Sequence, residues 1–165
     1  MKAKRYRTLL YLSLALLVVI IDRWSKGFVR ELLSDGATLD LLPFLDLVLI
    51  YNQGAAFGFL AKASGWQTLF FIVVGAIISI FIVIRIIRFP SAETWLDVAL
   101  VFILGGAVGN LIDRIRQGYV VDFIELHYGG FQFPAFNVAD MAIFLGATIL
   151  VLDLLRISPR RKSGL

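Results

Sequence analysis

Four long apolar runs divide the chain and set its predicted architecture. The clearest run is 66–84, which carries no charged residue. The other runs hold only isolated charges, as at Asp97 and Asp140. A helix that crosses a bilayer needs roughly 20 mostly apolar residues. The pattern therefore predicts four membrane helices, at about 8–28, 66–88, 95–113 and 138–156.

Most of the positive charges that flank these helices fall on one side. They are Lys2, Lys4, Arg5 and Arg7, then Arg85 and Arg88, then Arg156, Arg160, Arg161 and Lys162. Because Lys and Arg concentrate in cytoplasmic flanks, we expect both termini in the cytoplasm. Segments 31–65 and 114–137 are then extracytoplasmic, and reporters fused at Lys62 and Lys162 should report opposite sides.

The two outer segments alternate strand and turn signals. Residues 45–51 and 119–127 have strand character, and Asn52-Gln-Gly54 is typical of a turn. Tyr128-Gly-Gly130 could turn the second strand back toward 131–133. We therefore expect an all-α membrane protein, a single domain over 1–165, with a small extracytoplasmic sheet or loop cradle resting on the membrane surface.

Composition narrows the chemistry. The chain has 165 residues, of which 59% are hydrophobic and 17% charged, as expected when lipid is the solvent. It has no cysteine and one histidine, which excludes disulfides, a thiolate nucleophile and a multi-histidine metal site. The net charge of +4 is explained by the helix flanks, so no nucleic-acid partner is expected.

Polar residues gather at one predicted depth, near the outer face. Separate segments bring Asp22, Asp113 with Arg114, and Asp140 to that level. An ionisable group at membrane depth is unfavourable and persists mostly for function or pairing. Such convergence predicts a site. No second polar cluster is expected toward the cytoplasm.

Several of these residues have a structural interpretation. Asp22 and Lys26 are four apart and can pair on one helix face. Gly106 and its neighbouring glycines allow close helix packing. Asn110 shares a face with Gly106 and Arg114, and an asparagine that faces the bundle is harder to explain by packing alone.

Asp122 and Asp140 are the candidate catalytic pair. Asp122 lies in an apolar strand-like run with no adjacent cation. Two close carboxylates do not both ionise readily, so one can serve as acid and the other as base toward a water. An alternative stays open for Asn137 and Asp140, because Asn-x-x-Asp at a helix start can be simple capping.

Five ordered blocks carry a family resemblance. They are Asp22-Arg-Trp-Ser-Lys26, Asn52-Gln-Gly-Ala-Ala-Phe-Gly58, Gly105-Gly-Ala-Val-Gly-Asn-Leu-Ile-Asp-Arg114, Val120-Val-Asp-Phe-Ile124 and Phe136-Asn-Val-Ala-Asp140. Together they resemble the lipoprotein signal peptidases, also called signal peptidase II. The likeness covers nearly the whole chain between the first and fourth helices.

The resemblance implies a globomycin-sensitive aspartic endopeptidase of the bacterial inner membrane. Its substrates would be prolipoproteins that carry diacylglycerol on a cysteine, cut just before that cysteine. Asp122 and Asp140 fall on the catalytic positions. Positions that line the site or hold substrate match Asn52, Gly54, Asn110, Arg114 and Asn137. No cofactor is implied, membrane lipid is the surrounding partner, and we expect a monomer.

The polar residues allow two alternative functions. A proton-coupled transporter could use intramembrane Asp and Arg residues as a relay, but the polar groups lie on one side and no repeat is present. A non-enzymatic scaffold could use Asn, Gly and Asp to join helices, but it gives no reason for Asp122 in an apolar run.

Overall fold

The computed structural model describes residues 2–34, 36–54, 66–88 and 94–155. The elements are α1 (Lys2–Leu32), β1 (Leu39–Leu42), β2 (Leu45–Asn52), α2 (Trp66–Arg88), α3 (Thr94–Gln117), β3 (Val120–Tyr128), β4 (Phe131–Gln132) and α4 (Val138–Leu154). The second half of the predicted Asn52–Gly58 block, Lys62 and the basic tail from 156 onward lie outside the described residues.

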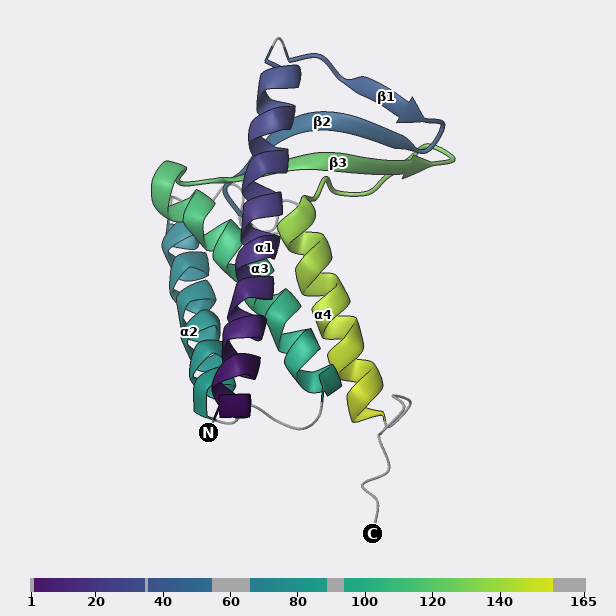
Figure 1. Ribbon diagram of the computed structural model, residues 1–165. Helices are drawn as coiled ribbons and strands as arrows, with labels where there is room; N and C mark the ends of the chain where they lie inside the picture. Colours follow the sequence, from purple (N-terminus) through teal and green to yellow (C-terminus); the bar gives the residue numbers. More distant parts are fainter. Residues whose placement is uncertain (1, 35, 55–65, 89–93, 156–165) are drawn as a thin grey trace.

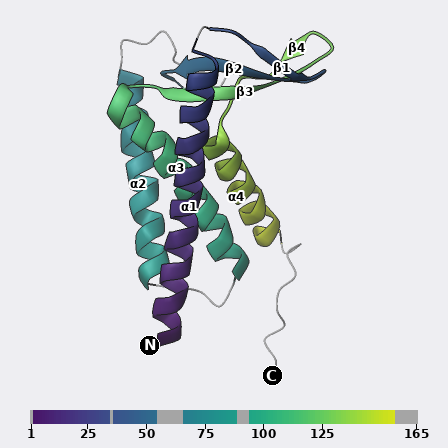
Figure 2. The ribbon, with the colours of Figure 1, turned by 45° about the horizontal axis from the view of Figure 1, so that its top comes forward.

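The helices form an upright bundle with a sheet laid across one end (Figure 1). Helix α3 is central, since it packs against α1, α2 and α4. α1 begins and α4 ends at the end of the bundle away from the sheet (Figures 1 and 2). The helix count and the sheet match the expected fold, although the sheet is a larger feature than an all-α description conveys.

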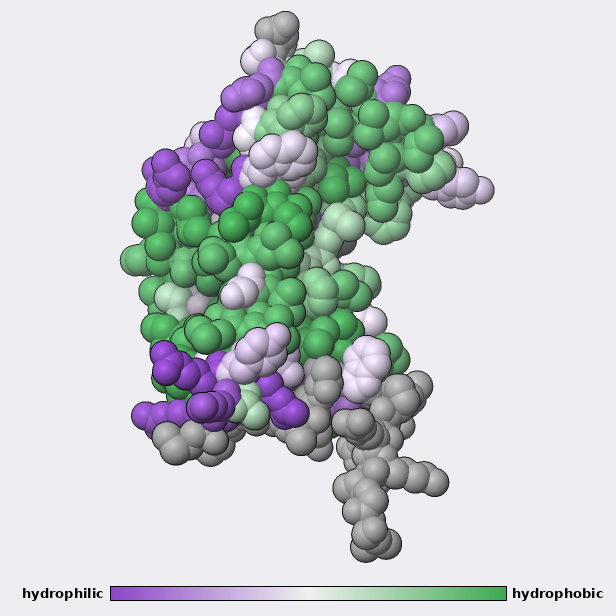
Figure 3. Space-filling model, viewed as in Figure 1, coloured by the Kyte–Doolittle hydropathy of each residue, from purple (hydrophilic) through white to green (hydrophobic). Residues whose placement is uncertain are grey.

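Three helices in the described part of the chain are long and apolar enough to cross a membrane. They are α1, α2 and α3. The fourth, α4, has 17 residues, or about 26 Å at roughly 1.5 Å per residue. An apolar band encircles the visible face of the bundle between two hydrophilic zones (Figure 3).

The sheet is antiparallel, in the order β1-β2-β3-β4. Strand β2 was predicted at 45–51 and β3 at 119–127, and the structure confirms both within one residue at each end. The predicted turn back is also present: Gly129 and Gly130 have φ of 57° and 86°, which favours glycine in a two-residue hairpin. β1 was not predicted.

Two apolar clusters hold the parts together. One lies in the bundle, with Tyr11, Ala15, Ile82, Ile86, Leu100, Val101 and Leu104 buried between α1, α2 and α3. The other joins Val29 of α1, and Leu33 just after its end, to Phe123 of β3. The second cluster fixes the sheet on the end of α1, and thereby fixes where Asp122 lies relative to the helices.

Glycines set the spacing of α3 from its neighbours. A Cβ on Gly106 would lie 2.2 Å from the carbonyl oxygen of Ala139, and one on Gly109 would lie 2.7 Å from Oδ2 of Asp22. The packing predicted for Gly106 is therefore present, and its partner is the first turn of α4.

One expectation about the bundle is wrong. A second polar group is buried toward the other end, where Asp97 of α3 is fully buried and lies 4.0 Å from Nη1 of Arg85 in α2. The sequence pattern places Arg85 in the cytoplasmic flank of α2 and so does not predict this pair. In the structure its long side chain extends back toward Asp97.

Candidate active site

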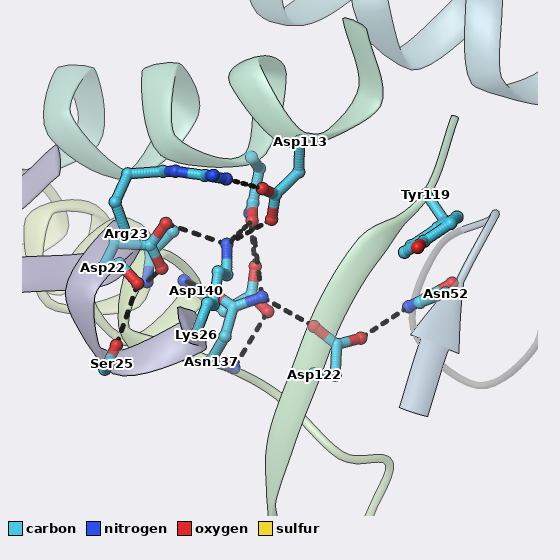
Figure 4. A network of polar contacts seen from close by, with 12 residues as sticks. Asp22, Arg23, Ser25, Lys26, Asn52, Asp113, Tyr119, Asp122, Asn137 and Asp140 are labelled. Atoms are coloured by element: carbon cyan, nitrogen blue, oxygen red, sulfur yellow. Dashed lines mark hydrogen bonds and ion pairs between the residues drawn. The ribbon is translucent and has the colours of Figure 1, made fainter. Parts of the chain in front are cut away.

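Asp122 and Asp140 come from different elements, one from the sheet and one from the helix bundle. Asp122 lies on β3, opposite Ile50 of β2, and Asp140 lies in the first turn of α4 (Figure 4). Asp122 is buried with 2% of its surface exposed, and Asp140 is half-buried. The two carboxyls therefore have different environments, Asp122 the drier one.

Asn137 joins the two aspartates. Its Nδ2 donates to Oδ1 of Asp122 at 2.6 Å, and its Oδ1 accepts from the backbone N–H of Asp140 at 2.9 Å. Its own backbone N–H donates to Oδ2 of Asp140 at 3.3 Å. The capping interpretation left open above is thus present as a complete capping box, and the same asparagine also binds Asp122.

Two more asparagines complete the contacts of the pair. Nδ2 of Asn52, at the end of β2, donates to Oδ2 of Asp122 at 2.9 Å. Nδ2 of Asn110, on α3, donates to Oδ1 of Asp140 at 2.7 Å. Within the described part of the chain, each carboxyl thus accepts two hydrogen bonds from N–H donors.

The pKa of Asp122 is raised from 3.8 to about 6, mainly because burial disfavours the charged form. The hydrogen bond from Asn52 opposes this shift, and the charge of Asp140 adds to it. A carboxyl that exchanges its proton near neutral pH suits general acid–base work.

Arg114 borders the pair from α3. Its Nη2 donates to the carbonyl oxygen of Gly54 at 3.1 Å, and its guanidinium lies 4.9 Å from the ring centre of Phe71. Gly54 in turn donates its N–H to Oδ1 of Asn52 at 3.0 Å. The structure thus brings all seven predicted site residues into one connected region.

A buried ion-pair cluster adjoins this region. Nζ of Lys26 lies 2.8 Å from Oδ2 of Asp22 and 2.9 Å from Oδ2 of Asp113. Arg23 also pairs with Asp113, and Oδ1 of Asp22 accepts from the backbone N–H of Ala139 at 2.9 Å. The predicted Asp22–Lys26 pair is present, but the sequence missed Asp113 and Arg23 as its partners.

A further contact was also missed. Nζ of Lys26 donates to Oδ1 of Asn110 at 3.1 Å, which links the ion-pair cluster to the aspartates. The equal depth of Asp22 and Asp113 was the sequence signal for the cluster. Nothing in the sequence indicated which way the Asn110 amide turns.

Comparison with known proteins decides the class of this site. The family model described as signal peptidase (SPase) II matches residues 14–156. The chain belongs to the signal peptidase II family. Membership makes it an aspartic peptidase that removes signal peptides from prolipoproteins, and a multi-pass bacterial membrane protein.

Curated relatives agree over most of the chain. A lipoprotein signal peptidase of Acinetobacter baumannii is 46% identical over 145 residues, covering 88% of this chain and 82% of that protein. One from Burkholderia vietnamiensis is 44% identical over 146 residues, covering 88% and 87%. One from Alteromonas mediterranea is 40% identical over 156 residues, covering 94% and 86%.

The fold agrees as well. A solved bacterial membrane enzyme superposes with a TM-score of 0.78 at 32% identity, covering 94% of this chain and 93% of that one. Membership of this family excludes the two alternative functions of the polar residues, a proton-coupled transporter and a non-enzymatic scaffold.

Proposed function

We propose that Asp122 and Asp140 are the catalytic aspartates and hold one attacking water between them. The observation that carries the proposal is the position of Asn137, which bonds to both residues at once. Asn137 is fully buried, so its contacts are not exchanged with bulk water. This arrangement keeps the two carboxyls in fixed relation, as a reaction that needs an acid and a base on one water requires.

In the first step, Asp122 carries the proton of the pair and Asp140 is ionised. Asp140 takes a proton from the water as its oxygen bonds to the scissile carbonyl carbon. Asp122 gives its proton to the carbonyl oxygen, which produces a neutral gem-diol. The drier environment of Asp122 supports its assignment as the protonated member.

In the second step, the gem-diol collapses and restores the pair. Asp140 gives its new proton to the peptide nitrogen as the C–N bond breaks, and Asp122 takes a proton from a diol hydroxyl. Water has then been added across the peptide bond, and both carboxyls are back in their starting states.

The neighbouring residues position substrate and acid. Asn52 and Asn137 hold Asp122 by both carboxyl oxygens. Arg114 uses one nitrogen for Gly54, and we propose that a second N–H of its guanidinium binds a carbonyl of the substrate backbone. Gly54 has a buried backbone whose N–H and carbonyl oxygen are both bonded, so it ties Asn52 to Arg114.

We propose further that the substrate is the diacylglyceryl form of a prolipoprotein, cut before the lipidated cysteine. Asp122 lies on β3 and Asp140 in the first turn of α4, where the sheet meets the apolar bundle (Figures 1 and 3). A lipid attached next to the scissile bond can therefore stay in the bilayer. Burying acyl chains is worth about 0.8 kcal/mol per CH₂.

The experiment compares one purified prolipoprotein with and without diacylglycerol on its cysteine. We expect the lipidated form to be cleaved at least about 100-fold faster, because contacts between the enzyme and the diacylglyceryl group then contribute about 2.8 kcal/mol or more to binding of the transition state. Mass spectrometry should find a product that begins at the lipidated cysteine. Equal rates for the two precursors would contradict the lipid requirement.

We also propose that all four helices, including α4, cross the inner membrane of a monomeric enzyme, with the sheet outside and both termini in the cytoplasm. The arginines at the end of α2, Arg85 and Arg88, lie at the end opposite the sheet, which supports this orientation.

Single cysteines can test the topology, because the chain has none of its own. Tyr128→Cys, at a side chain that is 84% exposed, should react with an impermeant maleimide in intact spheroplasts. Lys2→Cys should react only after the membrane is permeabilised. Labelling of both from the same side would overturn the proposed orientation.

A further inference from the structure

Three asparagine side chains supply donors to the aspartates, and each must face the right way to do so. A side-chain amide can rotate and exchange its donor and acceptor ends. If one of these amides rotated, an oxygen would face a carboxyl oxygen and a hydrogen bond would be lost. Some other group must therefore hold the oxygen of each amide.

For two of the three, that group belongs to the backbone. The N–H of Gly54 donates to Oδ1 of Asn52 at 3.0 Å. The N–H of Asp140 donates to Oδ1 of Asn137 at 2.9 Å. A backbone N–H can only donate, so it fixes the amide oxygen toward itself and turns Nδ2 toward Asp122.

For Asn110 a side chain has this role. Nζ of Lys26 donates to Oδ1 of Asn110 at 3.1 Å, and an ammonium has three donors and no acceptor. Nδ2 of Asn110 is thereby turned toward Oδ1 of Asp140, at 2.7 Å. Nδ2 of Asn137 also approaches Oδ1 of Asn110, at 3.3 Å, which reinforces the same orientation.

Lys26 is itself held rigidly. It is 2% exposed, it donates to Oδ2 of Asp22 at 2.8 Å, and its Nζ lies within ion-pair distance of Oδ2 of Asp113, at 2.9 Å. Arg23 pairs with Asp113, so two cations face two carboxylates. The two cations and two carboxylates lie together (Figure 4), and Lys26 contacts the active site through its hydrogen bond to Asn110. Its charge also lowers the pKa of Asp122.

We propose that Lys26 is a positioning residue for peptide hydrolysis, which acts by holding the Asn110 amide so that it donates to Asp140. The proposal rests on the catalytic role of Asp140 argued above. It adds to the structural role that the Asp22–Lys26 spacing predicts, because it gives the ammonium an effect on the reaction itself.

The first test compares Lys26→Met with Arg23→Met. Both changes remove one cation from the same cluster, but of these two cations it is Lys26 that donates to Asn110, whereas Arg23 pairs with Asp113. We expect Lys26→Met to lower kcat about 10- to 100-fold per folded molecule, with KM changed less than about twofold. Arg23→Met should keep kcat within about twofold. Equal losses in the two variants, or an unchanged kcat in Lys26→Met, would overturn the proposal.

The second test is a double-mutant cycle with Asn110→Ala. If Lys26 acts through the Asn110 amide, adding Lys26→Met to Asn110→Ala should lower kcat less than about twofold further. Losses that multiply in the double variant would show that Lys26 acts by another route. A purely structural role changes the amount of folded protein and gives no such dependence of kcat on residue 110.

A charge-balanced variant guards against misfolding. Asp22→Asn with Lys26→Met removes one charge of each sign, and the asparagine can still accept from Ala139. It should show the same loss of kcat as Lys26→Met. If neither variant folds, the role of Lys26 is in folding, and the proposal is overturned. An inactive Asp140→Asn beside a fully active Lys26→Met would contradict this inference alone, whereas an active Asp140→Asn would contradict the proposed function.

Discussion

Purified Asp140→Asn should cleave a diacylglyceryl prolipoprotein at least about 10³-fold more slowly than the unchanged enzyme, and so should Asp122→Asn. The substitution keeps the size of the side chain but removes the proton exchange that the two-step mechanism requires. Because the pair acts as a unit, the double variant should be scarcely slower than either single one.

The same variants separate catalysis from capping. Asparagine can still accept the bond from the backbone N–H of Asn137, so a residue that only completed the capping box would leave activity largely intact. Glu125→Gln is the matched control, a carboxyl-to-amide change on the same strand as Asp122. It should stay within about twofold of the unchanged enzyme. Substantial cleavage by Asp140→Asn would remove Asp140 from the mechanism.

Gly106→Ala should have the largest effect on stability. The added Cβ would lie 2.2 Å from the carbonyl oxygen of Ala139, which belongs to the α4 backbone and cannot rotate away. α3 and α4 would have to separate, at a cost of at least about 2 kcal/mol. The midpoint of thermal unfolding in detergent should fall by about 4–8 °C.

Gly27→Ala is the control for that measurement. Gly27 lies within α1, and a Cβ there would meet nothing within 4 Å. Alanine is the better helix former by about 1 kcal/mol, so this variant should be unchanged or slightly more stable. A Gly106→Ala protein as stable as Gly27→Ala would show that α3 and α4 tolerate a wider separation than the structure implies.

The helices and two main strands were predictable because their signals are local. An apolar run such as 66–84 indicates a membrane helix wherever it later packs, and short runs of strand character next to turn signals indicated β2 and β3. β1 was missed because its four residues are all exposed, so no buried face marks its pattern. Its pairing with β2 depends on the turn between Leu42 and Leu45, not on a core.

The sequence predicted which residues form the site better than it predicted which of them touch. Depth alone indicated Asp22, Asp113 and Asp140, because a helix rises by a fixed distance per residue. Which groups touch depends on how closely the helices approach, and Gly106 and Gly109 set that distance. The contact from Lys26 to Asn110 joins residues 84 apart in sequence, and no local pattern specifies it.

The depth of a charged group was harder to predict than the depth of the backbone that carries it. Arg85 was assigned to a cytoplasmic flank, yet its guanidinium lies 4.0 Å from the fully buried Asp97. A long side chain can place its charge several ångströms from its Cα, so position along the helix gives the depth of the backbone and not of the charge.

The claim that Asp122 and Asp140 act as one unit is tested most directly by titrating Asp122 with and without its partner. ¹³C NMR of labelled aspartate carboxyls in detergent can follow Asp122, identified by the resonance that Asp122→Asn removes. Burial raises its pKa to about 6, and the charge of Asp140 contributes to that rise. We therefore expect a midpoint near pH 6 in the unchanged enzyme and a lower midpoint in Asp140→Asn, because a neighbouring negative charge has been removed. The same midpoint in both proteins would mean that the two carboxyls do not interact, and would contradict the two-aspartate account.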